Sequence, residues 1–212
     1  MAQFFSVHPE NPQPRLIRQA VDIIREGGVV AYPTDSCSAL GCHIGDKAAM
    51  ERIRRIRDVD ERHHFTLVCR NLSEVGQFAK VDNLQFRLIR ANTPGSYTFV
   101  LRATRDVPRR LLAPRHTIGV RIPGHNVAMA LLETLGEPIL SSTLILPAHG
   151  VALNDAAEIR RHLEHAIDLV IDSGPCNGQV TTVVDLSGDA PRLVREGGGD
   201  IRPFGFVKTA LH

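Results

Sequence analysis

The stretch Val29–Gly41, VVAYPTDSCSALG, indicates the fold class of this 212-residue chain more clearly than any other part of it. Its apolar run, residues 29–32, ends at Pro33. Proline cannot donate a hydrogen bond within a sheet, so the run predicts a buried strand that stops there. Three small polar residues follow, Thr34, Asp35 and Ser36. Because side chains just past a strand end can face the ligand cleft of an open α/β sheet, we expect this strand end at a binding site.

Two later stretches repeat this arrangement of an apolar strand that ends in polar or charged residues. They are residues 117–123, TIGVRIP, and residues 139–143, ILSST. Helical periodicity predicts helices between the strands, one of them over residues 82–91, with expected N-caps at Asn11, Asp46, Asn126 and Asp155. Helices and strands alternate irregularly, which favours an α/β fold with a mixed parallel and antiparallel sheet. We expect a single domain over residues 1–212, with its core at about 15–200.

The composition is that of a globular protein, with 43% hydrophobic and 23% charged residues. No apolar run is long enough to cross a bilayer, and residues 1–14 lack the basic-then-apolar pattern of a secretion signal. We therefore expect a cytoplasmic protein with no membrane partner. The four cysteines form no C-x-x-C pair, and in the cytosol we expect them to be reduced.

Charge is distributed unevenly along the chain. Between Arg102 and His125 there are six arginines and one acidic residue, and between Glu51 and Arg70 there are six arginines and four acidic residues. Residues 155–172 reverse the sign, with five acidic residues and two arginines. A basic face favours an anionic partner such as a nucleotide, a phosphate or RNA. Charge alone does not distinguish such a partner from a solvated, arginine-rich surface.

Several familiar ligand motifs are absent. The chain contains neither the P-loop pattern nor G-x-G-x-x-G after a strand, so a bound nucleotide would be held in another way. His162 and His165 share a predicted helix without a third ligand, and we interpret them as part of a solvated face. We assign no metal site to protein side chains. The adjacent His63 and His64 fit phosphate neighbours better than zinc ligands, and we interpret residues 197–199, GGG, as a flexible turn.

Seven sequence blocks, in order, resemble the YrdC/YciO family of translation-associated proteins. The resemblance runs from about Ala20 to Asp200, and the blocks are residues 30–41, 55–57 (RIR), 94–100 (PGSYTFV), 117–123, 140–143, 181–185 (TTVVD) and 194–197 (VREG). The wording of residues 141–147, SSTLILP, and the FFSVHP start are most similar to the YciO branch.

This resemblance implies a fold and an activity. The implied fold is a twisted, open mixed sheet with flanking helices and a wide basic cleft. The implied reaction makes L-threonylcarbamoyladenylate from L-threonine, bicarbonate and ATP, with Mg²⁺ on the triphosphate, and releases pyrophosphate. The product supplies the threonylcarbamoyl group of N6-threonylcarbamoyladenosine in tRNA. Members of the family have also been linked to double-stranded RNA binding.

The resemblance also implies roles for single residues. The expected catalytic residues, which would contact phosphate or carbamate oxygens, are Arg55 and Arg57. The expected threonine-binding residues are Thr34, Arg121, Thr143 and Thr181, with Arg121 holding the carboxylate. The expected nucleotide-binding residues are Thr117, Ser141 and Arg195. Each residue alone also has a structural interpretation, as a strand-forming threonine or a surface ion pair.

Two positions depart from the pattern of the synthases. Arg55 stands where the family usually has lysine, and a planar guanidinium does not replace a compact ammonium in a tight site. Ile145 stands where the family has asparagine, so an apolar side chain takes the place of a polar contact. Residues 58–66 are also longer and more charged than the usual turn. These departures imply a cleft that forms the adenylate slowly or accepts a related substrate.

Three functions remain open from the sequence. The first is a threonylcarbamoyl-AMP synthase, and the second is an adenylate-forming enzyme for another amino acid. The third is a non-catalytic translation accessory protein that binds double-stranded RNA or tRNA through Arg109 and Arg110. Aromatic residues make up only 5% of the chain and do not interleave with the basic stretches, which favours double-stranded over single-stranded RNA.

Overall fold

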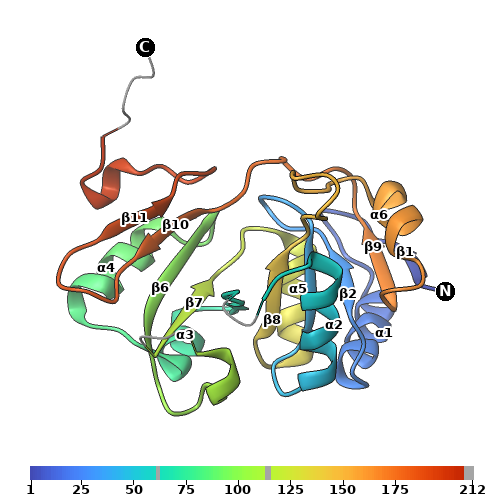
Figure 1. The fold of residues 1–212 in the computed structure, drawn as a ribbon, viewed down its shortest axis with the longest axis horizontal. Helices are drawn as coiled ribbons and strands as arrows, with labels where there is room; N and C mark the ends of the chain where they lie inside the picture. The colour runs from blue at the N-terminus through green and yellow to red at the C-terminus, as the bar shows by residue number, and fades with distance from the viewer. Residues whose placement is uncertain (61–62, 113–115, 208–212) are drawn as a thin grey trace.

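The computed structural model describes residues 1–60, 63–112 and 116–207. Its strands form one sheet in the order β1-β9-β2-β3-β8-β4-β7-β6-β10-β11, and β5 pairs with β6 outside this path (Figure 1). The strands are β1 (Gln3–Ser6), β2 (Val30–Tyr32), β3 (Ala39–His43), β4 (Thr66–Val68), β5 (Ala79–Lys80), β6 (Tyr97–Ala103), β7 (Thr117–Arg121), β8 (Ile139–Thr143), β9 (Leu169–Asp172), β10 (Thr182–Asp185) and β11 (Arg192–Arg195).

The sheet is mixed, as the irregular alternation of elements predicts. Strand β9 is parallel to β1 and β2, β4 is parallel to β7, and β6 is parallel to β10. The pairs β2–β3, β3–β8, β4–β8, β6–β7 and β10–β11 are antiparallel. The prediction of an α/β fold with a mixed sheet is confirmed.

Helices cover both faces of the β9-β2-β3-β8 half. Helices α1 (Pro14–Arg25) and α5 (Asn126–Leu135) pack together on the face that Val30 and Tyr32 present. Helices α2 (Lys47–Arg57) and α6 (Ala156–Leu163) cover the opposite face, to which Ala31 and Leu40 belong. Side chains alternate between the faces of a strand, so a strand buried on both faces is apolar throughout. This explains the continuous apolar run before Pro33.

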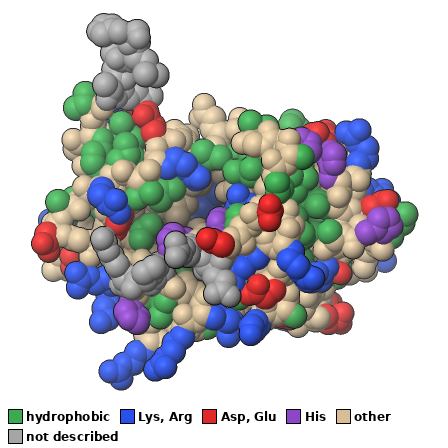
Figure 2. Space-filling model, in the orientation of Figure 1, with side chains coloured by type: hydrophobic (Ala, Val, Ile, Leu, Met, Phe, Trp, Pro, Cys, Tyr) green, Lys and Arg blue, Asp and Glu red, His purple; other side chains and the backbone are tan. Residues whose placement is uncertain are grey.

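The other half of the sheet, β7-β6-β10-β11, forms a second lobe (Figure 1). Its helices are α3 (Leu72–Phe78) and α4 (Asn83–Asn92), and short 3₁₀ turns occur at η1 (Arg109–Leu111) and η2 (Arg202–Phe204). The space-filling view shows a hollow between the two lobes with basic and histidine side chains inside it (Figure 2). Within the described ranges, no helix combines the length and the apolar character needed to span a bilayer.

Several local predictions were wrong. Helix α1 begins at Pro14 after Gln13, not at Asn11, and the side chain of His125 rather than Asn126 accepts the capping bond of α5. Strand β1 falls in a segment whose prolines and polar residues suggested no strand, yet it pairs with β9 along its whole length. The predicted cap at Asp46 is confirmed, because its carboxylate accepts a bond of 2.8 Å from the backbone of Ala49.

Residues 197–199 are not a flexible turn. The backbone N–H groups of Gly197 and Gly199 both donate to the hydroxyl of Thr182 at 3.0 Å. A Cβ atom at Gly197 would lie 2.2 Å from the carbonyl oxygen of Val180, so only glycine allows this approach. The glycines therefore dock the chain that follows β11 against the start of β10.

Candidate functional site

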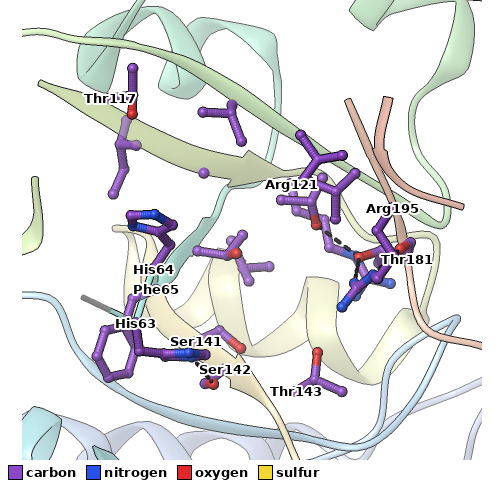
Figure 3. Close-up of a pocket in the computed structure, with 18 of the residues that line it drawn as sticks. His63, His64, Phe65, Thr117, Arg121, Ser141, Ser142, Thr143, Thr181 and Arg195 are labelled. Atoms are coloured by element: carbon purple, nitrogen blue, oxygen red, sulfur yellow. Dashed lines mark hydrogen bonds between the residues drawn. The ribbon is translucent and has the colours of Figure 1, made fainter. Parts of the chain in front are cut away.

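A cavity of about 440 Å³ lies between the two lobes, a volume suited to a small-molecule ligand (Figure 3). Its wall combines apolar side chains such as Val68, Ile118 and Val183 with hydroxyl, histidine and arginine side chains. Of the residues predicted to form the site, seven line this cavity: Arg57, Thr117, Arg121, Ser141, Thr143, Thr181 and Arg195. Residues of β7, β8, β11 and α2, with Thr181 at the start of β10, therefore line one cavity, whereas Thr34, Asp35 and Ser36 after β2 do not line it.

Strand β7 runs along the wall of the cavity. Thr117, Gly119 and Arg121 alternate along the strand, and all three line the cavity. Four residues of extended chain place Thr117 about 13 Å from Arg121. Figure 3 shows Thr117 at one end of the cavity, with Arg121, Thr181 and Arg195 at the other. The cavity can therefore hold an extended ligand with chemically different ends.

The side chain of Thr34 stabilises the turn after β2 through hydrogen bonds to the backbone. The Thr34 hydroxyl donates to the carbonyl of Cys37 at 2.6 Å and accepts from the backbone N–H of Ser36 at 3.2 Å. Thr34 is buried and does not line the cavity. That Thr34 contacts the amino acid stays a prediction, and in the structure its hydroxyl is hydrogen-bonded within the turn.

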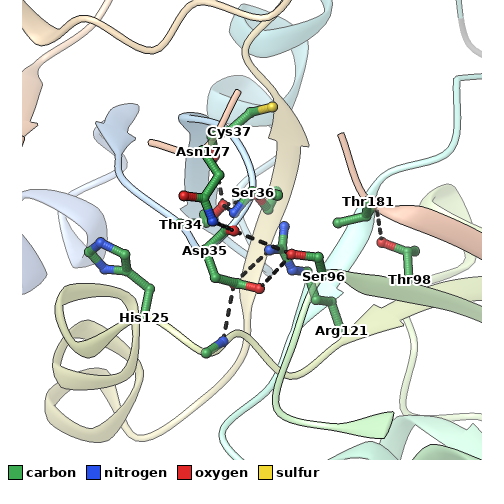
Figure 4. A network of polar contacts seen from close by, with 12 residues as sticks. Thr34, Asp35, Ser36, Cys37, Ser96, Thr98, Arg121, His125, Asn177 and Thr181 are labelled. Carbon is green, nitrogen blue, oxygen red and sulfur yellow. Dashed lines mark hydrogen bonds and ion pairs between the residues drawn. The ribbon is translucent and has the colours of Figure 1, made fainter. Parts of the chain in front are cut away.

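Asp35 links this turn to three other segments (Figure 4). Its Oδ1 accepts from Nη2 of Arg121 at 2.7 Å and from the backbone N–H of Gly124 at 3.1 Å. Its Oδ2 accepts from the Ser96 hydroxyl at 3.0 Å, and its carbonyl accepts from Nδ2 of Asn177 at 3.0 Å. Asp35 thus holds the guanidinium of Arg121 in place across the lobe boundary.

Arg121 is buried but only partly satisfied. Its Nη2 binds Asp35, whereas its Nε is buried and has no hydrogen-bond partner among the described residues. A buried donor without an acceptor costs about 1–3 kcal/mol, more when it is charged. An anionic ligand in the cavity would supply the missing acceptor.

Arg195, on β11, is held in place by hydrogen bonds to Thr181. Its Nε donates to the carbonyl of Thr181 at 3.0 Å, and its Nη2 donates to the Thr181 hydroxyl at 2.9 Å. That hydroxyl also bonds the hydroxyl of Thr98 at 3.0 Å. Thr181 therefore positions Arg195, and its hydroxyl already has two partners before any ligand binds.

Arg57 and Arg55 differ in location although they are two residues apart. The Nη1 of Arg57 donates to the Ser142 hydroxyl at 2.6 Å, and its Nε donates to the carbonyl of Ile145 at 3.3 Å. Arg55 is exposed on α2 and does not line the cavity. The structure therefore separates the two predicted catalytic arginines, because residues two apart on a helix point to different sides. A catalytic role for Arg55 stays a prediction.

The substituted position Ile145 lies in the cavity wall, as do Ser141 and Thr143. Ser141 is buried, accepts a bond of 2.8 Å from the hydroxyl of Tyr32 and donates one of 3.3 Å to the carbonyl of Leu40. Its proton is therefore already used within the protein. Burial raises the pKa of Tyr32 to about 12, so that hydroxyl remains a donor to Ser141 at neutral pH.

The cavity has an excess of positive charge. Four arginines line it, and two of them pair with carboxylates, Arg121 with Asp35 and Arg192 with Asp185. In the described part of the chain, the hydrogen bonds of Arg57 and Arg195 go to hydroxyl, carbonyl and imidazole groups only. Burial lowers the pKa of Arg57, and the charge of Arg195 lowers it further. These guanidinium groups repel each other, and an anion between them would relieve that repulsion.

Sequence reasoning gave Ser142 and Ser96 no role in the site, and it gave Asp35 no role beyond its place in the polar strand end. Asp35 stands inside the PTDS block, but its partner Arg121 is distant in the chain and no periodicity pairs the two. Arg109 and Arg110 are exposed at η1, and Arg110 donates to the carbonyl of Gly45 at 2.6 Å. RNA binding through these two residues stays a prediction. Arg115, Glu61 and Arg62, counted in the basic stretches, lie outside the described residues.

His63 predicts a pH-dependent stability. Its Nε2 lies 2.9 Å from the Ser142 hydroxyl and 3.2 Å from Nη1 of Arg57. Burial, followed by the charge of Arg57, lowers its pKa from 6.5 to about 4. The unfolded chain therefore binds a proton at higher pH than the folded chain does. We expect the stabilisation that neutral His63 gives to be complete above pH 6.5 and to be lost as the pH falls toward 4.

This loss should amount to roughly 2 kcal/mol, since partial exposure reduces the full linkage value. Urea unfolding of the wild type and of His63→Gln at pH 7.5 and pH 4.5 measures it. The wild type should lose more stability than the variant over this range. Equal losses in both proteins would show that His63 does not resist protonation in the fold.

Comparison with known proteins gives the family. A family model described as telomere recombination, the Sua5/YciO/YrdC model, matches residues 22–197. The chain belongs to the Sua5/YciO/YrdC family. Within that family, protein YciO of Escherichia coli K12, described as uncharacterized, is 56% identical over 205 residues, covering 96% of this chain and 100% of YciO. The threonylcarbamoyl-AMP synthase of Halorhodospira halophila is 31% identical over 164 residues, covering 77% of this chain and 85% of the synthase.

Solved structures of the Sua5/YciO/YrdC family agree with this assignment. The crystal structure of E. coli YciO has a TM-score of 0.93 and covers 96% of this chain and 100% of its own. The structure of P. abyssi Sua5 complexed with L-threonine has a TM-score of 0.84 at 28% identity, covering 92% of this chain and 57% of Sua5. The predicted family and YrdC-like fold are therefore confirmed, and the resemblance to the YciO branch with them.

Proposed function

We propose that this protein binds ATP and L-threonine in the cavity between its lobes and forms L-threonylcarbamoyladenylate with bicarbonate, releasing pyrophosphate. The observation that carries the proposal is the excess of guanidinium groups in one cavity, with Arg57 and Arg195 bonded to no carboxylate in the described ranges. A nucleoside triphosphate and an amino-acid carboxylate are the anions that this excess would neutralise. The family's synthases and the threonine complex of Sua5 support the choice of substrates.

The proposed reaction has two steps. Bicarbonate loses hydroxide to give CO₂, the amine nitrogen of L-threonine bonds to the CO₂ carbon, and the proton that the nitrogen loses combines with the hydroxide as water, giving a carbamate. A carbamate oxygen then bonds to the α-phosphorus of ATP, while the bond from that phosphorus to the bridging oxygen breaks and pyrophosphate leaves. Negative charge grows on the phosphoryl oxygens and on the leaving group. Catalysis of such a step rests on positioning and on cations placed where the charge develops.

In this proposal, three arginines of the cavity supply the cations for the carboxylate of L-threonine and for the phosphates of ATP. The unpartnered Nε of Arg121 would bind the carboxylate of L-threonine, with Asp35 holding the other side of the guanidinium. Arg57 and Arg195 would lie against the phosphates, since both line the cavity without a carboxylate partner in the described chain. Thr143 lines the same wall and would contact the amino acid.

The described part of the cavity wall offers few oxygen ligands for magnesium. Among the described lining residues the one carboxylate is Asp185, which bonds Arg192 at 2.8 Å and the Ser187 hydroxyl at 2.6 Å. Mg²⁺ prefers several oxygen ligands in octahedral geometry. We therefore propose that Mg²⁺ enters with the triphosphate, and we assign no step to a protein-bound metal.

Pyrophosphate release tests the proposal. The protein with ATP, Mg²⁺, L-threonine and bicarbonate should release pyrophosphate and form a product with the mass of threonylcarbamoyladenylate. Omission of threonine or bicarbonate should abolish both signals. Release no greater than that of the Arg57→Ala, Arg121→Ala double variant would contradict the proposal. Release that needs another amino acid instead of threonine would reassign the substrate while keeping the reaction class.

A further inference from the structure

Three side chains of metal-ligand type meet outside the cavity. His149 lies in the loop after β8, and Glu158 and His162 lie on α6. One ligand atom from each residue lies within 4.8 Å of the other two. The interpretation of His162 and His165 as part of a solvated face did not include this cluster, because His149 comes from another segment of the chain.

The local structure explains why these side chains meet. Glu158 and His162 are four residues apart on a helix and therefore share one face of α6. The loop before α6 folds back on itself, since Ile145 pairs with Ala152 and the backbone N–H of His149 donates to the carbonyl of Leu146 at 3.0 Å. This loop brings His149 against the helix, where its ring meets that of His162 edge to face at a centroid distance of 4.8 Å.

His149, one residue of this cluster, has a ring nitrogen without a hydrogen-bond partner in the described part of the chain. The Nδ1 of His149 is buried and has no hydrogen-bond partner among the described residues. A buried polar atom without a partner costs about 1–3 kcal/mol, so most such atoms in folded proteins find one. His149 therefore brings an imidazole with an unpartnered buried nitrogen next to two further side chains of metal-ligand type.

We propose that His149, Glu158 and His162 form a binding site for a divalent transition-metal ion, with Zn²⁺ as the ion. Two imidazoles and one carboxylate are a common ligand set for zinc, with the fourth position left to water. Tetrahedral zinc places its ligand atoms about 3.4 Å apart. The exposed side chain of His162 can turn to close the remaining distance. The proposal is independent of the reaction in the cavity.

Zinc at this site would connect α6 to the wall of the cavity. The loop that carries His149 begins at Ile145, whose side chain lines the cavity and whose carbonyl accepts a bond from Arg57. A metal that joins this loop to α6 would therefore restrict its movement. We infer a stabilising role for the ion, with its open coordination position facing water.

Metal titration of the full chain tests the site. Cobalt(II) serves as the visible probe, and Zn²⁺ should displace it from a single site per chain. His149→Ala and His162→Ala should each weaken Zn²⁺ binding by at least about tenfold. Zn²⁺ should also raise the thermal unfolding midpoint of the wild type and leave that of His149→Ala unchanged.

His165→Ala is the matched control. His165 follows closely in the chain, its side chain is 79% exposed, and it pairs with Glu164 instead of joining the cluster. Its loss should leave the Zn²⁺ affinity unchanged. The proposal is overturned if the wild type binds no stoichiometric Zn²⁺, or if His165→Ala weakens binding as much as His162→Ala. Because His162 is exposed, its alanine variant keeps the test valid even if His149→Ala folds poorly.

Discussion

Arg57→Ala should lower threonine-dependent pyrophosphate release by about 10²–10³-fold, the usual effect of removing one charge-stabilising donor from a reacting centre. The guanidinium of Arg57 reaches the cavity from α2 and bonds Ser142, a hydroxyl on β8. Arg57 has no carboxylate partner in the described chain, so its charge is free to act on an anionic ligand. A coupled pyrophosphate assay at saturating ATP measures the effect.

Arg55→Ala is the control for this result. Arg55 lies on the same helix, carries the same charge and is exposed outside the cavity. Its removal should leave the rate unchanged within about twofold, since an exposed charge outside the site is screened by water. Equal losses for the two variants would mean that the general positive charge of α2, rather than the position of Arg57, matters for the reaction.

Asp35→Ala should lower the free energy of unfolding by about 3–5 kcal/mol, because it leaves the buried guanidinium of Arg121 without its anion. The side chains of this pair are 9% and 14% exposed, and their oxygen and nitrogen lie 2.7 Å apart. Asp35 also accepts bonds from Gly124 and Ser96, so its loss removes further partners from the same junction. Urea unfolding at neutral pH measures the change.

Arg202→Ala provides the comparison for the Asp35 experiment. Its side chain is 80% exposed and pairs with Asp200 at the surface, where an ion pair contributes little to stability. Asp35→Asn, which keeps the shape but loses the charge, should fall between the wild type and Asp35→Ala. If Asp35→Ala unfolds at the same urea concentration as Arg202→Ala, the buried pair does not stabilise the lobe boundary.

Part of the site was predictable because strand ends can be read from the sequence. A run of apolar residues followed by proline or small polar residues marks a strand and its rim, and Arg121 and Ser141 stand in such stretches. Thr181 came only from the family resemblance. Whether a rim side chain faces a ligand was not predictable. The hydroxyls of Thr34 and Ser141 are taken up by the neighbouring backbone and by Tyr32, which depends on the tertiary arrangement.

Helix α2, which carries Arg55 and Arg57, also separates what the sequence predicts from what depends on the tertiary structure. The sequence block placed both arginines near the reaction, but α2 turns one toward the cavity and the other toward water. The orientation of a helix about its axis follows from its apolar stripe, here Ala49, Met50 and Ile53 against the sheet. The apolar stripe of the sequence already places Arg55 on the side of this helix away from the core, although the family block assigns both arginines to the site.

The sequence by itself determined most of the strands, the main helices, the mixed sheet and the family, because each of these depends on local periodicity or on the order of short blocks. Tertiary structure alone decided which polar groups are free to meet a ligand. The pairing of Asp35 with Arg121 and the meeting of His149 with α6 join residues from separate segments. Contacts of this kind depend on how the sheet and its loops pack in three dimensions, and no pattern along the chain encodes them.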